Sequence, residues 1–180
     1  AKGEVARTIQ TYKFAAQEAG RIYGETLPLD AAPGGGNRLA YTKHEPLGVI
    51  GAITPFNFPM NLVAHKVGPA IATGNTVVLK PASQTPISSY FLAELLEKAG
   101  LPAGALNVVT GSGRVVGDRI VTDDRISMIT FTGSPEVGTE IRSKAGLKRT
   151  TLELGSNAAV IIDEDTDIDR VIPRCVQGAF

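Results

Sequence analysis

The sequence is poor in the residues that form disulfides and bind metals. It contains one cysteine, Cys175, and two histidines, His44 and His65, in 180 residues. A single cysteine cannot form a disulfide within the chain, which fits a reducing compartment such as the cytoplasm. Three scattered nitrogen and sulfur ligands do not match the spacing of a zinc site. We therefore expect a cytoplasmic protein without a metal.

The sequence also lacks a charge excess and a long apolar run. Eighteen basic and eighteen acidic residues cancel, so we expect neither a nucleic-acid partner nor an anionic membrane surface as a partner. No apolar run approaches the roughly 20 residues that span a membrane, and the first residues do not have the layout of a signal peptide. The chain opens inside a helical pattern and has no closing signal at its end, which suggests a piece of a longer protein.

Short apolar strands that alternate with helices dominate the rest of the pattern. β-branched runs predict strands at 48–54, 76–80, 106–110, 126–132, 150–154 and 158–162. Apolar periodicity and helix start signals predict helices at 4–23, at 85–100, from Ser134 with Pro135 at the first position, and from about Asp167. This alternation is typical of a parallel sheet covered on both faces. We predict an α/β, Rossmann-like fold.

Two segments have a separate interpretation. Residues 25–46 carry Pro33 and three successive glycines between two extended runs, which predicts a protruding hairpin or a loose connection. Residues 111–117, "GSGRVVG", have the spacing G-x-G-x-x-x-G and not the dinucleotide fingerprint G-x-G-x-x-G. Alone, this run predicts only a tight turn into a helix.

Candidate site residues follow the predicted strands, because ligands bind beyond the carboxyl ends of a parallel sheet. Asn57 follows the first strand, Lys80 ends the second, Ser134 begins a helix whose free N–H groups suit a phosphate, and Glu153 ends the fifth strand in "LELGSN". Each also has a purely structural interpretation: a loop-fixing amide, a solvated strand end, a helix cap and a solvent-facing acid.

Two other reactive side chains have a structural interpretation. We expect His65 to pack in its helix and Cys175 to be a buried, inert thiol. No lysine, histidine or helix start lies directly beside Cys175, and His65 lies among Leu62, Val63 and Val67.

Four segments together resemble the aldehyde dehydrogenase superfamily. They are "PLGVIGAITPFNFP" (46–59), "GNTVVLKPASQTP" (74–86), "FTGSPEVG" (131–138) and "LELGSN" (152–157). Within this superfamily, these segments are most similar in sequence to those of the succinate-semialdehyde, lactaldehyde and non-phosphorylating glyceraldehyde-3-phosphate dehydrogenases. The resemblance implies that residues 1–180 are a cofactor-binding domain without the catalytic domain. It also implies that 25–46 is part of an oligomerisation hairpin of a homodimer or homotetramer.

The resemblance further implies NAD(P)-dependent oxidation of a small aldehyde to a carboxylic acid through a thiohemiacetal and a thioester. Asn57 matches the family's oxyanion donor and Glu153 its general base. Apolar neighbours disfavour the ionised form of an acid, which would suit such a base. The family's nucleophilic cysteine lies beyond Phe180, and Cys175 does not match it. The fragment alone is therefore expected to be inactive.

The cofactor residues are implied in the same way, with NADP favoured over NAD. Ser83 replaces an acid of the family that would repel the 2′-phosphate of NADP. Two other positions differ from the family: Phe56 stands where a tryptophan is common, and Ser156 where a glycine is common. The matching positions are Lys80 and Ser83 at the adenine ribose, Gly113, Gly133, Ser134 and Val137 around the adenine and pyrophosphate, and Thr54, Phe56, Leu154 and Gly155 toward the nicotinamide.

Two alternatives remain open at this stage. One is a nucleotide-binding module of the same fold without catalysis, because the chain carries no matching nucleophile. The other is an acyl-phosphate reductase relative, which needs no water-activating acid and is therefore disfavoured by Glu153. A short-chain dehydrogenase is disfavoured because no tyrosine is followed four residues later by a lysine.

Overall fold

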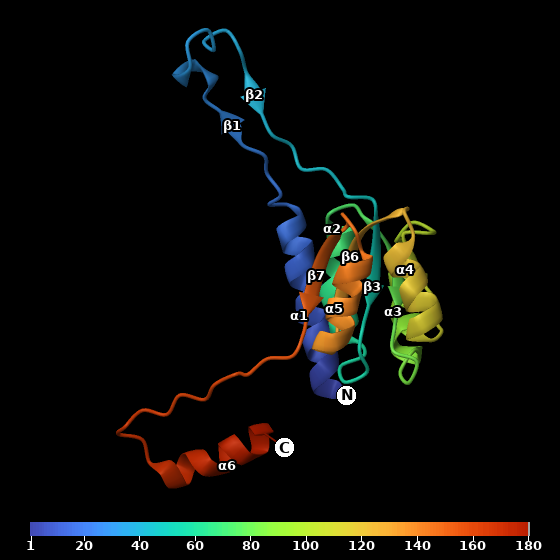
Figure 1. Ribbon diagram of the computed structural model, residues 1–180, viewed down its shortest axis with the longest axis vertical. Coiled ribbons are helices and arrows are strands. Elements are labelled where there is room, and N and C mark those ends of the chain that lie inside the picture. The colour runs from blue at the N-terminus through green and yellow to red at the C-terminus, as the bar shows by residue number, and fades with distance from the viewer. Residues whose placement is uncertain (180) are drawn as a thin grey trace.

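The computed structural model describes residues 1–179 and has a central parallel sheet, a protruding hairpin and a separate C-terminal helix (Figure 1). The strands are β1 (Thr26–Leu27), β2 (Ala40–Tyr41), β3 (Val49–Ile53), β4 (Thr76–Lys80), β5 (Leu106–Val108), β6 (Ile126–Thr132) and β7 (Arg149–Glu153). The α-helices are α1 (Lys2–Ala19), α2 (Asn61–Ala72), α3 (Ile87–Lys98), α4 (Asp118–Thr122), α5 (Pro135–Lys144) and α6 (Ile168–Ala179). Two short turns of helix, η1 (Leu29–Ala31) and η2 (Gly113–Gly117), complete the elements.

The five-stranded sheet has the order β5-β4-β3-β6-β7, and all its pairs are parallel. The chain winds from β3 outward to β5 and then returns to place β6 on the other side of β3. Ile53 pairs with Lys80 and with Phe131, so the strands end level at one edge. The reversal between β3 and β6 is a topological switch point, where ligands bind in doubly wound sheets.

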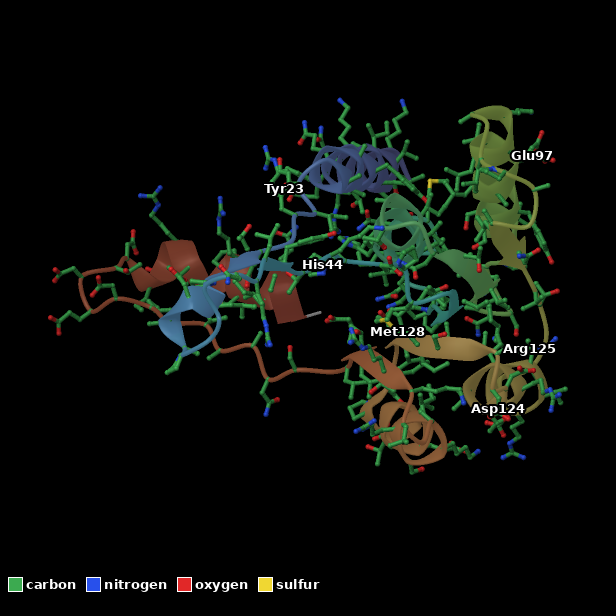
Figure 2. The ribbon with its side chains drawn as sticks, turned by 90° about the horizontal axis from the view of Figure 1, so that it is seen from above. Tyr23, His44, Glu97, Asp124, Arg125 and Met128 are labelled. Carbon is green, nitrogen blue, oxygen red and sulfur yellow. The ribbon has the colours of Figure 1, made fainter. Side chains whose placement is uncertain are left out.

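Helices cover both faces of this sheet, as Figure 2 shows from above: α1, α2 and α3 lie on one face, and α4 and α5 lie on the other. Apolar side chains of the strands pack against each helical layer. The core on the α2 side consists of Ile50, Ala52, Val63, Val67, Ala70, Val77, Leu79 and Leu92. The core on the α4 and α5 side consists of Ile120, Val121, Ile126, Ile129, Phe131, Ile141 and Ala145. The Rossmann-like α/β prediction is confirmed.

Close approach of α4 to the sheet depends on Gly51 in β3. A Cβ atom at this position would overlap the side chain of Ile120 in α4 and press on Ile129 in β6. The missing side chain lets α4 settle over β3 and β6, beside the switch point. The glycine therefore helps to bring η2 and α4 to the edge where the strands end.

Helix α1 buries only part of the apolar stripe that its periodicity predicts, which consists of Val5, Ile9, Tyr12, Ala16, Ala19 and Tyr23. It ends at Ala19, before the expected residue 23, and Val5 and Ile9 of the predicted apolar stripe are exposed. Thr8 is buried instead, and Tyr12 packs against the α2-side core. This face of α1 packs on α2, where a Cβ atom at Gly68 would be in ordinary contact with Tyr12 and Ala15.

The hairpin prediction is confirmed, and the prediction of a sixth core strand is wrong. β1 and β2 pair antiparallel and project from the body (Figure 1). Residues 158–162 form an extended connection that, within residues 1–179, pairs with no strand, and Val160 and Ile161 are exposed. A strand needs a neighbour for its N–H and C=O groups, and this segment leads away from β7. The predicted late helix is α6, which includes Pro173.

Candidate functional site

Backbone hydrogen bonds join the strand ends at the edge where the candidate residues lie. The N–H of Thr54 donates to the carbonyl oxygen of Lys80 at 3.2 Å, and the N–H of Gly133 donates to that of Glu153 at 3.1 Å. Lys80 is only 5% exposed, its amine donates to the carbonyl oxygen of Pro81 at 3.2 Å, and burial lowers its pKa. The interpretation of Lys80 as a solvated strand end is therefore wrong.

A cleft of about 250 Å³ lies at the switch point, between η2 and α4 on one side and α5 on the other. It brings together Gly113 and Val137, two residues that come from different sequence motifs. The other lining residues are Ile53, Arg114, Gly117, Asp118, Val121, Glu140, Ile141 and Lys144. Aliphatic walls with polar groups at the rim suit a flat heteroaromatic ring that carries polar substituents.

A charge cluster ties the two helical walls of this cleft together. The amine of Lys144 in α5 donates to Asp118 in α4 at 3.1 Å and also to Glu140, one turn earlier in α5. Glu140 and then Asp118 raise the pKa of Lys144 through these hydrogen bonds. The cluster is partly exposed, so it contributes little stability. Its effect is to hold α4 against α5 at the open end of the cleft.

Serine caps begin both helical segments beside the cleft. The Ser134 hydroxyl accepts a hydrogen bond from Val137 N at 3.4 Å, which confirms the predicted cap of α5. The Ser112 hydroxyl accepts one from Val115 N at 3.3 Å, and η2 leads directly into α4. The interpretation of "GSGRVVG" as a tight turn into a helix is thus confirmed. Helix starts favour anions, and Gly113 and Val137, one from each of these starts, both line the cleft.

Two hydroxyl groups lie along the same edge. The Ser83 side chain is exposed and donates to the carbonyl oxygen of Gly111 at 3.2 Å. The Thr54 hydroxyl is buried, yet no residue from 1 to 179 forms a hydrogen bond with it. Buried polar groups are nearly always paired, so the unpaired Thr54 hydroxyl is an exception; Thr54 follows Ile53, which lines the cleft, but does not line it itself. The aliphatic lining of the cleft and the serine-capped helix starts beside it fit the adenine ring and the phosphates of a dinucleotide.

Asn57 and Glu153 follow strands that are not neighbours. Asn57 and Phe56 are exposed in the loop 54–60 after β3, and β6 separates β3 from β7. At about 4.8 Å per strand, β3 and β7 lie roughly 10 Å apart. Glu153 is exposed, so the apolar surroundings expected for it are not formed by residues 1–179. The physical reason is that β7 is an edge strand with a neighbour on one side only.

Leu154 and Gly155, which follow Glu153, lie against α5. A Cβ at Gly138 would overlap the side chain of Leu154, and one at Gly155 would contact Pro135. The chain therefore leaves β7 along the first turn of α5, close to the capping residue Ser134.

Lys66 is a site residue that the sequence reasoning missed. It projects from α2 into the protein, is 6% exposed, and its amine donates to the Thr130 hydroxyl in β6 at 3.1 Å. Burial lowers the pKa of Lys66 to about 8, while the negative charge of Glu153 acts in the opposite direction. The signal in the sequence was a cation within the otherwise apolar helical repeat of Val63 and Val67.

His65 and Cys175, which were expected to be packed in the interior, are less buried than expected. His65 is exposed, so the prediction that it packs is wrong, and Cys175 in α6 is half-buried instead of buried. His65 faces away from the sheet because Lys66 and Val67 occupy the inner face of α2. Among residues 1–179, no group of three or more histidine, cysteine or acidic side chains is placed to hold a metal ion.

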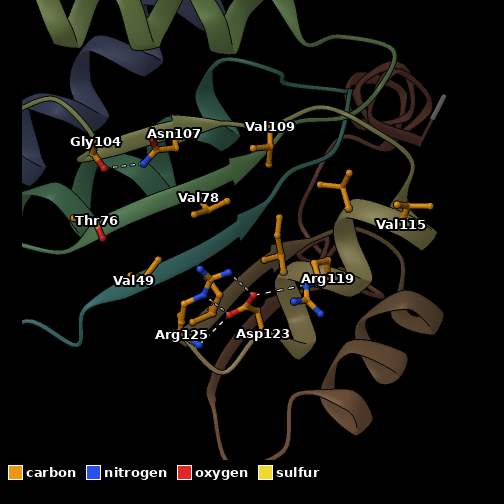
Figure 3. A pocket seen from close by; sticks show the side chains of 13 residues that line it. Val49, Thr76, Val78, Gly104, Asn107, Val109, Val115, Arg119, Asp123 and Arg125 are labelled. Carbon is orange, nitrogen blue, oxygen red and sulfur yellow. Dashed lines mark hydrogen bonds and ion pairs between the residues drawn. The ribbon is translucent and has the colours of Figure 1, made fainter.

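A larger pocket of about 630 Å³ lies over the face of β4 and β5 (Figure 3). Val49, Val78 and Val109 form its floor, and Asp123 pairs with Arg125 at one end, at 2.8 Å. These hydrogen bonds hold the pKa of Asp123 well below its usual range. None of the site residues predicted from the sequence lines this pocket. It is the part of the sheet face that α4 and α5 leave uncovered.

The fold is that of a doubly wound α/β protein with a cleft at its switch point. The chain belongs to the aldehyde dehydrogenase family, whose family model matches residues 1–180. None of the helices within residues 1–179 is long and apolar enough to cross a membrane.

Several members of this family are similar to the chain in sequence and in structure. The chain is 52% identical over 179 residues to a 3-sulfolactaldehyde dehydrogenase of Priestia megaterium, covering 99% of this chain and 38% of that protein. An NADP-dependent glyceraldehyde-3-phosphate dehydrogenase from Bacillus halodurans, solved with NADP, is 46% identical with a TM-score of 0.91, covering 99% of this chain and 38% of that one. An aldehyde dehydrogenase from Bacillus cereus, solved with NAD+, is 40% identical with a TM-score of 0.89, covering 97% and 35%. The chain thus spans well under half of the length of these relatives.

Proposed function

We propose that the longer protein oxidises a small aldehyde to a carboxylic acid with NADP or NAD, and that residues 1–180 are its cofactor-binding domain. The observation that carries this proposal is the cleft at the switch point, lined by Gly113 and Val137 from the starts of two helical segments. Membership of the aldehyde dehydrogenase family supports it, as do relatives that were solved with NADP and with NAD+.

The residues around the cleft have distinct roles toward the cofactor. The aliphatic walls, with Val137, hold the adenine ring, and Lys80 and Ser83, which match the ribose positions of the family, hold the ribose. The helix start at Ser134, with Gly133, holds the pyrophosphate, and Thr54, Phe56, Leu154 and Gly155 lie toward the nicotinamide. Ser83 is uncharged and Arg114 lines the cleft, so a 2′-phosphate meets no like charge there, which favours NADP. When bound, the cofactor supplies the hydride acceptor.

Asn57 and Glu153 act on the substrate in the longer protein. The side-chain amide of Asn57 donates to the oxyanion that forms when a thiolate attacks the aldehyde, a contribution of about 10²–10³ in rate for such a donor. Glu153 then accepts a proton from the water that hydrolyses the thioester. Lys66 lies in the electrostatic field of Glu153, so the two charges are coupled across β6. The nucleophilic thiol comes from outside this chain, because Cys175 does not match it.

The hairpin of β1 and β2 is proposed to join subunits into a homodimer or homotetramer in the cytoplasm. Leu27, Leu39 and Tyr41 expose apolar surface on this projection. Exposed apolar surface of this kind marks contact sites in many proteins.

Glu153→Gln in the full-length protein tests the catalytic assignment. We expect a burst of reduced cofactor of about one equivalent per site and then a steady state at least about 100-fold slower, since only hydrolysis needs the base. The matched control is Glu97→Gln on the exposed surface of α3, which should behave as the unaltered enzyme. A Glu153→Gln enzyme that is slow from the first turnover would contradict the role in hydrolysis.

A further inference from the structure

Helix α1 contacts the loop that carries Asn57, although the two are more than 50 residues apart in the sequence. The Glu4 carboxylate accepts hydrogen bonds from the backbone N–H of Met60 at 2.8 Å and of Asn61 at 3.1 Å. These N–H groups begin α2, whose N-cap residue, Met60, forms no side-chain cap. The first N–H groups of a helix have no partner within the helix, and here α1 supplies one. Figure 1 shows the loop after β3 beside the first turn of α1.

Three further contacts hold the same loop. The guanidinium of Arg7 lies over the ring of Phe58 at 5.3 Å from its centre, a cation–π contact. The Thr11 hydroxyl donates to the side-chain oxygen of Asn61 at 3.3 Å. From the opposite side, the Ser88 hydroxyl donates to the carbonyl oxygen of Pro59 at 3.3 Å. The C-terminal half of the loop is therefore held from α1 and from α3.

Asn57 directly precedes this held segment and lies three residues before Met60. Pro55 and Pro59 restrict the backbone on both sides of it, because proline fixes φ near −65°. The side chain of Asn57 is exposed at the edge of the sheet. Its position therefore follows from the backbone, and the backbone position follows from the contacts at residues 58–61.

We propose that Glu4 is a positioning residue for Asn57: its carboxylate, by capping α2, holds the loop 54–60 where the Asn57 amide meets the developing oxyanion. The inference rests on the proposed role of Asn57. A donor must be placed accurately to act, and a displacement of about 1 Å can cost on the order of 10²-fold in rate.

A carboxylate suits this task better than a neutral acceptor. It accepts charge-assisted hydrogen bonds, and its negative charge lies at the positive end of the helix dipole. Glu4 and Asn57 belong to different elements, so α1 acts as a support for a loop that would otherwise end at an uncapped helix.

The test uses the full-length enzyme with Glu4→Ala and Glu4→Asp. Aspartate keeps the charge but is one methylene shorter, so it cannot reach both N–H groups from the same backbone. We expect kcat to fall about 10- to 100-fold for alanine and less for aspartate, while the cofactor Kd, measured by fluorescence titration, stays within about twofold. Glu4→Gln keeps an acceptor oxygen and should retain most of the rate. Glu18→Ala, on the same helix but paired only with Arg21, is the control and should leave kcat unchanged.

A double variant separates positioning from a general structural effect. In the presence of Asn57→Ala, the change Glu4→Ala should lower kcat no further, because the group that it positions is already gone. The proposal would be overturned if Glu4→Ala lowered kcat by the same factor with and without Asn57→Ala. An unchanged kcat in both Glu4→Ala and Glu4→Asp would also overturn it. If Asn57→Ala alone left kcat unchanged, the proposed role of Asn57 would fail as well. If only the Glu4 variants were silent, that role would stand and the positioning role would fail.

Discussion

Replacing Lys66 by methionine should stabilise the protein at neutral pH and remove part of its pH dependence. The lysine amine is buried between α2 and β6, with the Thr130 hydroxyl at 3.1 Å. Burial lowers the pKa of Lys66 from 10.5 to about 8. Since one pKa unit corresponds to 1.36 kcal/mol, keeping this amine charged in the folded state costs about 3 kcal/mol at neutral pH. Methionine has a similar length and carries no charge to desolvate.

The direction of the pH effect follows from which state holds the proton. Below pH 8, Lys66 is protonated in both the folded and the unfolded protein, so the full cost is present. Between about pH 8 and 10.5 the folded protein releases this proton first, so the unfolded state binds more protons and stability rises with pH. Above 10.5 the amine is neutral in both states and the cost is gone.

Urea unfolding of the full-length protein at pH 7 and pH 10 measures this effect. We expect the free energy of unfolding of Lys66→Met to exceed that of the unaltered protein by about 3 kcal/mol at pH 7 and by less than about 1 kcal/mol at pH 10. Other groups titrate in this range, among them Tyr12, whose pKa burial raises, but they contribute equally to both proteins. Lys98→Met on exposed α3 is the matched control and should show no such difference. A constant difference between Lys66→Met and the unaltered protein at both pH values would refute the reasoning.

The remaining predictions concern cofactor choice and the thiol. Ser83→Glu should raise the ratio of kcat/KM for NAD to that for NADP by at least about tenfold, because the new carboxylate repels the 2′-phosphate beside the cleft; a ratio that does not change would place the selectivity elsewhere. Cys175→Ser should keep kcat within about twofold of the unaltered enzyme, because this thiol lies in α6 and does not match the nucleophile. A Cys175→Ser protein that folds normally but has lost its activity would show that the nucleophile was misassigned.

Most of the sheet could be predicted from local pattern. β4 and β6 have the predicted bounds, and the cap of α5 at Ser134 follows from a serine directly before a proline. Level strand ends are a property of parallel sheets, so the order of the motifs in the chain was enough to place Lys80, Gly133 and Glu153 at one edge. The roles of these residues remain proposals, because they depend on a bound cofactor and substrate.

Strand pairing and helix packing could not be predicted from the local sequence pattern. Residues 158–162 have strand composition but no neighbouring strand, and composition cannot show whether a neighbour exists. Likewise, the stripe of Val5 and Ile9 has helical periodicity, yet the Thr8 face of α1 is the one that packs on α2. Both outcomes depend on a second element that lies far away in the sequence.

The sequence alone determined the alternating strands and helices, the carboxyl edge of the sheet and the serine caps, because these depend on hydrophobic period and on short-range backbone hydrogen bonds. Only the tertiary structure decided that Lys66 is buried and interacts electrostatically with Glu153. It also decided that Glu153 lies exposed on an edge strand and that Glu4 caps α2. Desolvation, edge position and contacts between distant helices arise when separate elements pack together, so no window of the sequence contains them.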